Sequence, residues 1–130
     1  MSVVFTNGCF DILHRGHIEL LRFCKECGDI VVVGLNDDKS VKILKGESRP
    51  FNSESDRKLI LESLRYVDKV ILFDDETPYR LIQKIKPDII VKGGDYTAEQ
   101  VIGNDLAEVR IFKYIEGYSS TRTIKDIISR

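Results

Sequence analysis

Residues 3–17 read VVFTNGCFDILHRGH, and this stretch joins an apolar run to the start of a helical pattern. The run from Val3 to Phe5 is typical of a buried strand. The apolar spacing that follows predicts a helix from about Gly16 to Cys27, with an inward face of Ile18, Leu20, Leu21 and Cys24. A strand that turns directly into a helix is the first part of a βαβ unit, so this stretch indicates an α/β fold.

The rest of the chain repeats this alternation. Further apolar runs predict strands at residues 29–35, 69–73, 88–91 and 109–112. Helices are predicted from Ser53 to about residue 66, from Thr77 to before Pro87, and from residues 119–121 to Ile128. The second helix should bury Leu59, Ile60, Leu64 and Val67, and residues 42–52 should form a basic, mobile loop. We therefore predict one domain, residues 1–130, with a Rossmann-like, five-stranded, mostly parallel sheet and helices on both faces.

The composition limits the classes of partner. Hydrophobic residues make up 42% of the 130 residues and charged residues 32%, which is an ordinary globular balance. The formal net charge of −1 gives no general attraction to nucleic acid or to a membrane, and we expect neither as a partner. Three cysteines and the absence of a signal-like start predict a cytoplasmic protein. Cys24 and Cys27 lie one helical turn apart and should pack in the core rather than bind zinc.

The only two histidines, His14 and His17, flank Gly16 at the predicted strand-to-helix turn. Free backbone N–H groups at a helix start attract phosphate, and a glycine lets a ligand approach the backbone closely. Imidazole N–H groups can donate hydrogen bonds to oxygens that gain charge during phosphoryl transfer. The residues alone also allow a helix cap with a packed core histidine, or a metal site, although the pair lacks further ligands.

Beyond this chemistry, the run from Gly8 to His17 resembles the HxGH signature of the cytidylyltransferase-like nucleotidyltransferases. The run Ser119-Ser120-Thr121 resembles the second signature of the same family, which precedes its final helix. The resemblance extends over essentially the whole chain and implies the HUP-like nucleotidyltransferase fold. It also implies a direct in-line attack on the α-phosphorus of a nucleoside triphosphate, with release of pyrophosphate and no covalent enzyme intermediate.

The resemblance also implies the residues of the site. Catalytic roles fall to His14, His17 and Lys45. Arg122 joins them on physical grounds, because a cation in the first turn of the predicted last helix opposes the helix dipole and so indicates a ligand. Nucleotide-binding roles fall to Thr6, Asn7, Gly8, Cys9, Phe10, Asp11, Gly16, Lys92, Gly94, Asp95, Ser119, Ser120 and Thr121. Whether Lys42, Arg57 or Asp11 contacts a ligand stays open at this point. Mg²⁺ is expected to bridge the triphosphate without a dedicated protein site, and analogy with the family suggests a homodimer.

Two subfamilies fit the motifs. Residues 6–11 (TNGCFD), 44–50 (LKGESRP) and 86–96 (KPDIIVKGGDY) resemble the adenylyltransferase of ADP-heptose synthesis, which acts on D-glycero-β-D-manno-heptose 1-phosphate. The CTP-dependent cytidylyltransferases of glycerol 3-phosphate or choline phosphate carry an arginine that the matching residues 114–117 (YIEG) lack. We therefore predict ATP as the nucleotide and a phosphorylated sugar as the acceptor. A flavin or pantetheine-phosphate adenylyltransferase fits less well, and a non-catalytic nucleotide-binding regulatory domain is the alternative from another class.

Overall fold

The computed structural model describes residues 1–113 and 127–128. Its strands are β1 (Val3–Gly8), β2 (Ile30–Asn36), β3 (Lys69–Phe73), β4 (Ile89–Gly93) and β5 (Glu108–Phe112). Its helices are α1 (Arg15–Cys27), α2 (Asp38–Lys45), α3 (Glu54–Glu62), α4 (Tyr79–Ile85) and the short 3₁₀ helix η1 (Ala98–Gln100). The predicted strands are all present; β3 has the predicted bounds, and the others differ from theirs by one to a few residues.

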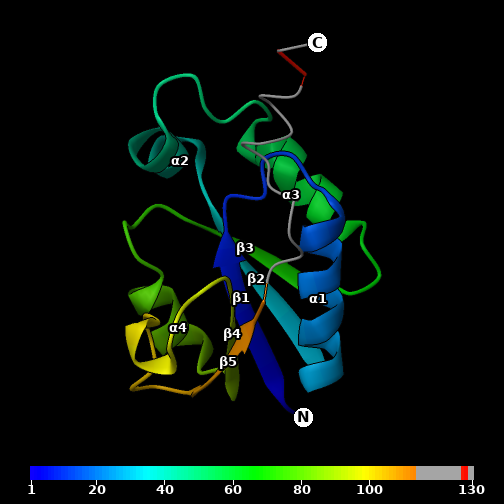
Figure 1. The fold of residues 1–130 in the computed structure, drawn as a ribbon, viewed down its shortest axis with the longest axis vertical. Coiled ribbons are helices and arrows are strands. Elements are labelled where there is room, and N and C mark those ends of the chain that lie inside the picture. The colour runs from blue at the N-terminus through cyan, green and yellow to red at the C-terminus, as the bar shows by residue number, and fades with distance from the viewer. Residues whose placement is uncertain (114–126, 129–130) are drawn as a thin grey trace.

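The five strands form one sheet in the order β3-β2-β1-β4-β5, and each of these pairs is parallel. This confirms the predicted Rossmann-like α/β fold. The strand order reverses direction between β1 and β4, and ligands of such sheets bind at this crevice, beyond the carboxyl ends of the strands. The N-terminal end of α1 and the whole of α2 lie at that end of the sheet (Figure 1).

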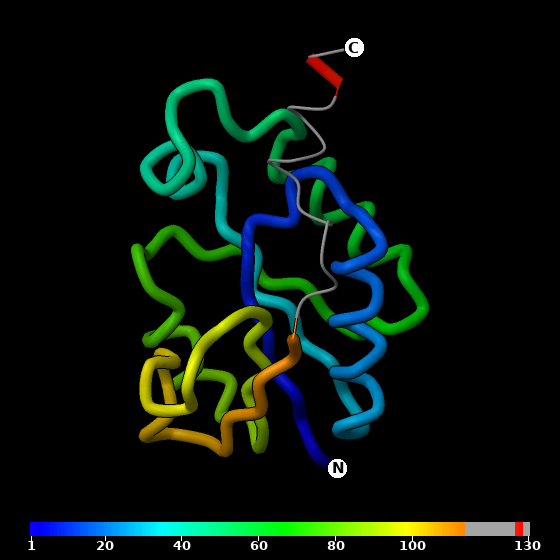
Figure 2. Tube along the Cα trace, in the orientation of Figure 1, coloured from blue at the N-terminus to red at the C-terminus, as the bar shows by residue number. Residues whose placement is uncertain are grey.

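Helices cover both faces of the sheet, as predicted (Figure 2). Helices α1 and α3 cover one face, where Leu21 and Leu61 pack with Val33 and its neighbours in one apolar cluster. Helix α4 and the segment around η1 cover the other face, where Ile82 and Val101 pack with Phe5, Val32 and Ile90. Successive strand residues therefore point into different clusters, as the pleat of a sheet requires.

Helix α3 turns a different face inward from the one predicted. Leu59 and Ile60 are 64% and 43% exposed, so the predicted buried stripe is wrong at these two positions. Arg57 and Leu61, one helical turn apart, face inward instead, and both are buried. The side chain of Arg57 is hydrogen-bonded on this inward face. The helix also ends at Glu62 rather than near residue 66.

Helix α2 was not predicted, and the expectation of a loop is wrong for residues 42–45. Both Lys42 and Lys45 lie in the last turn of α2. The helix begins after Asp37, whose side chain accepts a hydrogen bond from Ser40 N at 2.8 Å. It ends at Gly46, where a φ of 108° suits glycine. The loop between α2 and α3 therefore begins at Gly46.

In the part of the chain that the structure describes, no helix combines the length and apolar character that a membrane span requires. The predicted final helix falls largely outside the described residues. The predicted site residues Ser119, Ser120, Thr121 and Arg122 also lie outside them.

Candidate active site

The two histidines cap helix α1 through reciprocal hydrogen bonds. His14 is the N-cap residue, and its Nδ1 accepts a hydrogen bond from Gly16 N at 3.0 Å. The Nδ1 of His17 accepts one from His14 N at 3.2 Å, and His17 N donates to the His14 carbonyl oxygen at 3.0 Å. The expectation of free N–H groups at this helix start is therefore wrong for Gly16 and His17, whose N–H groups are bonded within the motif.

These hydrogen bonds assign the same tautomer to both imidazole rings. A ring nitrogen that accepts a hydrogen bond carries no proton, so in each neutral ring the proton lies on Nε2. The ring centroids are 4.0 Å apart and the ring planes are inclined by 35°. Each ring thus carries its Nε2–H donor on the far side from the Nδ1 atom that caps the helix.

Burial keeps the two rings neutral near pH 7. It lowers the pKa of His17 to about 4, with a smaller contribution from the neighbouring His14. Burial also lowers the pKa of His14. A ring that stays neutral donates its Nε2–H at any pH near 7, so the pair is suited to stabilise a developing anion rather than to transfer protons.

Phe10 determines the path of the loop that leads to the histidines. Its φ of 45° lies in the left-handed region, which residues other than glycine rarely adopt. The Phe10 side chain is buried, and its ring centroid lies 5.4 Å from that of His17. A Cβ added at Gly8 would come within 3.0 Å of the Phe10 ring. Phe10, which was predicted to bind nucleotide, therefore fills the space between the end of β1 and His17.

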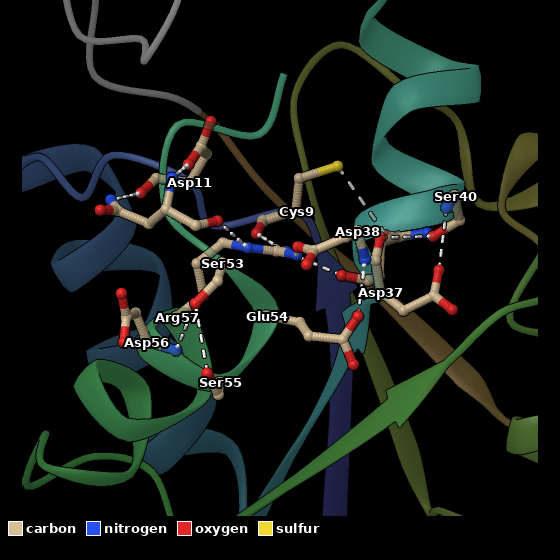
Figure 3. Close-up of polar contacts among 12 residues, drawn as sticks. Cys9, Asp11, Asp37, Asp38, Ser40, Ser53, Glu54, Ser55, Asp56 and Arg57 are labelled. Atoms are coloured by element: carbon tan, nitrogen blue, oxygen red, sulfur yellow. Dashed lines mark hydrogen bonds and ion pairs between the residues drawn. The ribbon is translucent and has the colours of Figure 1, made fainter. Parts of the chain in front are cut away.

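Asp11 connects this loop to the loop that follows α2 (Figure 3). Its Oδ2 accepts hydrogen bonds from Arg49 Nε at 3.0 Å and from Phe51 N at 2.8 Å, and its Oδ1 accepts one from Asn52 N at 2.9 Å. Burial acts to raise the pKa of Asp11, but the N–H groups of Asn52 and Phe51 and the Arg49 guanidinium hold it below its usual 3.8. Asp11 is thus an ionised brace between two loops of the site.

Arg57 joins three segments of the site from beneath (Figure 3). The residue is 1% exposed. It donates hydrogen bonds to the carbonyl oxygens of Cys9 at 2.8 Å, Asn36 at 2.7 Å and Asn52 at 3.0 Å. Its Nη2 also pairs with Asp38 Oδ1 at 2.8 Å. These bonds connect the loop after β1, the end of β2 and the start of α3, so the guanidinium is engaged within the protein.

Two lysines act on the region around Cys9. Lys45 is exposed in the last turn of α2, whereas Lys92 is partly buried in β4. Burial lowers the pKa of Lys92, the Cys9 thiol opposes this, and the charge of Lys45 adds to it. Burial raises the pKa of the Cys9 thiol, and Lys45 is the strongest of the charges that act against the rise. Cys9 therefore lies within the electrostatic influence of both lysines.

The segment after β4 reaches the same edge of the sheet. Lys92 and Gly93 belong to the strand, so the predicted loop begins at Gly94. Gly94 has a φ of 118°, and its N–H donates to the Phe112 carbonyl oxygen at 2.9 Å. A side chain at this position would be strained. Asp95 follows and is exposed beyond the strand end.

The described site residues thus gather at the carboxyl end of the sheet from three segments: residues 6–17, Lys45 in α2, and residues 92–95. Thr6 is 1% exposed, and its side chain belongs to the interior. Arg49 and Asn52, the partners of Asp11, were not predicted as site residues. Both belong to a polar loop whose composition gives no sign that an arginine there is buried.

Comparisons with known proteins agree with this arrangement. The family model described as cytidylyltransferase-like matches residues 5–125. The chain is 55% identical over 127 residues to the bifunctional protein HldE of Wolinella succinogenes, and 56% identical over 127 residues to that of Campylobacter concisus. Each match covers 97% of this chain but 27% of the relative, so the chain spans about a quarter of the length of these curated relatives.

Solved structures show the same fold. A lipopolysaccharide core biosynthesis protein from Thermoplasma volcanium superposes with a TM-score of 0.74 at 31% identity, over 92% of this chain and 99% of that one. A pantothenate synthetase from Thermus thermophilus superposes with a TM-score of 0.59 at 21% identity, over 97% of this chain and 64% of that one. The second likeness concerns the fold alone.

Proposed function

The chain belongs to the cytidylyltransferase-like family of nucleotidyltransferases, and from this premise we propose that it transfers AMP from ATP to a sugar 1-phosphate, D-glycero-D-manno-heptose 1-phosphate, with release of pyrophosphate. The observation that carries the proposal is the pair of neutral imidazoles, His14 and His17, whose Nδ1 atoms accept hydrogen bonds at the start of α1 and whose Nε2–H groups lie on the other side of each ring. The identity to the HldE relatives over 97% of the chain supports the heptose acceptor, together with the resemblance at residues 44–50 and 86–96.

In the proposed reaction an oxygen of the acceptor phosphate attacks the α-phosphorus of ATP in line with the leaving group. The bond from the α-phosphorus to the bridging oxygen of the β-phosphate breaks, and pyrophosphate leaves with the electron pair. Charge shifts among the phosphate oxygens in the transition state, so catalysis depends on orientation and on preorganised donors. His14 and His17 donate from Nε2 to those oxygens, and Lys45 supplies positive charge from α2.

The proposal assigns the triphosphate two further contacts outside the described residues. The hydroxyl and backbone groups of Ser119, Ser120 and Thr121 bind the β- and γ-phosphates, and Arg122 neutralises part of their charge. Mg²⁺ bound with the triphosphate would need no dedicated protein site, because phosphate oxygens and water would supply most of its ligands, and it would offset further negative charge. Asp11 has little acceptor capacity left for such an ion, because its oxygens already accept three hydrogen bonds.

We also propose that the protein acts in the cytoplasm as a homodimer. Its three cysteines are free thiols, which suits a reducing compartment. The dimer rests on analogy with the family. Light scattering coupled to size-exclusion chromatography tests it, and a monomeric mass at micromolar concentration would exclude it.

A substrate matrix tests the activity. ATP and CTP are each combined with heptose 1-phosphate, glucose 1-phosphate and glycerol 3-phosphate, and pyrophosphate release is followed. The expected result is turnover with ATP and heptose 1-phosphate. Turnover with CTP and glycerol 3-phosphate alone would favour the cytidylyltransferase alternative. Nucleotide binding without turnover on any acceptor would favour a regulatory domain.

A further inference from the structure

A small pocket opens where β1 and β4 end, on the sheet face opposite α1. Its volume is about 230 Å³. Asn7 lines it from β1 and Lys92 from β4, and the segment around η1 adds Tyr96 and Gln100. Its apolar lining consists of Pro78, Val101 and Ile102. The η1 segment lies beside α4, across β1 from helix α1 (Figure 1), so the pocket and the histidine pair approach the end of β1 from different faces.

The donor groups of this pocket form no hydrogen bond or ion pair with any residue that the structure describes. No described carboxylate pairs with Lys92, whose Nζ lies 5.4 Å from the Tyr96 ring centroid. Neither the Asn7 amide nor the Tyr96 hydroxyl forms a hydrogen bond to any residue that the structure describes. Gln100 accepts a hydrogen bond from Thr97 N through Oε1 at 2.9 Å, which leaves its NH₂ as a donor. Donor groups of four side chains thus line one pocket, and residues 1–113 and 127–128 offer them no hydrogen-bond acceptor.

The wall that carries Gln100 is already ordered. Thr97 and Gln100 form a reciprocal capping box around η1. Asn104 Nδ2 donates to the Val101 carbonyl oxygen at 2.7 Å and holds the turn that follows. A wall that is formed in advance loses little conformational entropy when a ligand binds.

The chemistry of the lining distinguishes an anionic polyol from a nucleotide base. Lys92 is a partly buried cation without a carboxylate, and burial lowers its pKa, so a bound anion would stabilise its charged form. Amide NH₂ and phenolic hydroxyl groups suit the hydroxyl oxygens of a sugar. Ligand pockets commonly measure about 300–1,000 Å³, so this smaller one has no room for a whole nucleoside triphosphate.

We propose that this pocket binds the sugar phosphate acceptor, with Lys92 at its phosphate and Asn7, Tyr96 and Gln100 at its sugar hydroxyls. The proposal rests on the proposed function and names the subsite of its second substrate. It changes the predicted role of Lys92 from nucleotide binding to acceptor binding. Lys92 and Lys45 influence the same thiol, Cys9, so an acceptor phosphate at Lys92 borders the region of the nucleotide phosphates. There its oxygen attacks the α-phosphorus from the side opposite the departing pyrophosphate.

Steady-state kinetics of the full chain with ATP and heptose 1-phosphate tests the pocket. Lys92→Met should raise the KM for heptose 1-phosphate about 10- to 100-fold, the effect of a lost charge-assisted hydrogen bond, and leave the KM for ATP within about twofold. Lys92→Arg should restore part of the loss. Lys58→Met is the matched control, because Lys58 lies on α3 in a surface pair with Glu62 and should change neither constant.

Two conservative variants test the hydroxyl contacts. Tyr96→Phe and Gln100→Glu should each raise the KM for heptose 1-phosphate about threefold to tenfold. Glutamate keeps an oxygen for Thr97 N, so the turn persists while the donor is removed. Glycerol 3-phosphate should inhibit the wild type by competing with heptose 1-phosphate, because it shares the phosphate but offers few hydroxyls. This inhibition should be lost in Lys92→Met and kept in Tyr96→Phe.

The outcomes separate the two proposals. If Lys92→Met raised the KM for ATP and left that of the sugar phosphate unchanged, the pocket would belong to the nucleotide. If the wild-type chain turned over no sugar phosphate, the proposed function would fail. Calorimetric titration with glucose 1-phosphate and with inorganic phosphate would then test separately whether the pocket binds a sugar phosphate. Binding by the wild type that Lys92→Met abolishes supports the pocket, and equal binding or none in both proteins overturns it.

Discussion

The substitution His17→Asn separates the functions of the two nitrogens of one imidazole ring. The side-chain oxygen of asparagine reaches about as far as Nδ1, so it can go on accepting the hydrogen bond from His14 N that now measures 3.2 Å. Nothing in asparagine reaches the position of Nε2. We expect kcat to fall about 10²- to 10³-fold, which is the cost of removing one preorganised donor to a developing oxyanion. The free energy of unfolding should change by less than about 1 kcal/mol, because the cap is kept.

The matched variant His17→Gln should give the opposite pattern. Glutamine reaches as far as Nε2, so its amide can supply the donor, but it vacates the Nδ1 position. It should keep more activity than asparagine and lose about 1 kcal/mol of stability with the cap. The assay is pyrophosphate release at saturating ATP and heptose 1-phosphate, with urea unfolding of each variant alongside. A His17→Asn enzyme within tenfold of the wild type, or one more active than His17→Gln, would refute the assignment of Nε2 as the donor.

Three other predictions concern charge and stability. The free energy of unfolding should be highest above about pH 6.5 and should fall by about 3 kcal/mol toward pH 4, because His17 binds a proton in this range in the unfolded state but not in the native state. Urea unfolding at several pH values should show this fall in the wild type, and the contribution of His17 to it should be absent in His17→Asn. Arg57→Met should lower the free energy of unfolding by about 3–5 kcal/mol, because it leaves buried carbonyl oxygens and Asp38 without their partner. Lys58→Met, the control, should lower it by about 0.5 kcal/mol or less. A loss below about 1 kcal/mol for Arg57→Met would contradict the structural role of this arginine. Lys45→Met should lower kcat/KM for ATP about 10- to 100-fold, because it removes a cation that contacts the triphosphate. Lys39→Met on the same helix is the control, and equal effects of the two substitutions would argue against a phosphate contact by Lys45.

The sheet was predictable because each strand is a short apolar run that can be recognised from its own residues. Each apolar run, such as residues 30–35, has the length and composition of a buried parallel strand, and the helices between the runs leave few other topologies. The histidine motif was predictable for a different reason, since it combines rare residue types with a glycine at a strand-to-helix turn. What the sequence could not supply is the direction of each hydrogen bond. The two imidazoles were expected beside free N–H groups, yet the His14 imidazole accepts from Gly16 N and the His14 carbonyl oxygen accepts from His17 N.

Helix α3 shows why the remaining predictions failed. Apolar periodicity assigns Leu59 and Ile60 to the interior, but it does not predict that Arg57 is buried in their place. Arg57 is buried there because several backbone carbonyl oxygens converge at the ends of β1 and β2, where no strand partner satisfies them. A guanidinium satisfies more of them than any other side chain, and its Asp38 partner balances the charge. The polar interior of a site at the end of a sheet thus overrides the pattern that predicts the rest of the helix.

The same interior determines where the site obtains its positive charge. The histidines are neutral near pH 7, two N–H groups at the start of α1 are already bonded, and Arg49 and Arg57 are paired with Asp11 and Asp38. None of these groups therefore supplies net charge to a triphosphate. Among the described residues that the sequence assigned to the site, this leaves Lys45 on α2 and Lys92 on β4, and both act on the Cys9 thiol. A separate lysine for each substrate phosphate would let the two anions be brought together without either one depending on the other's cation.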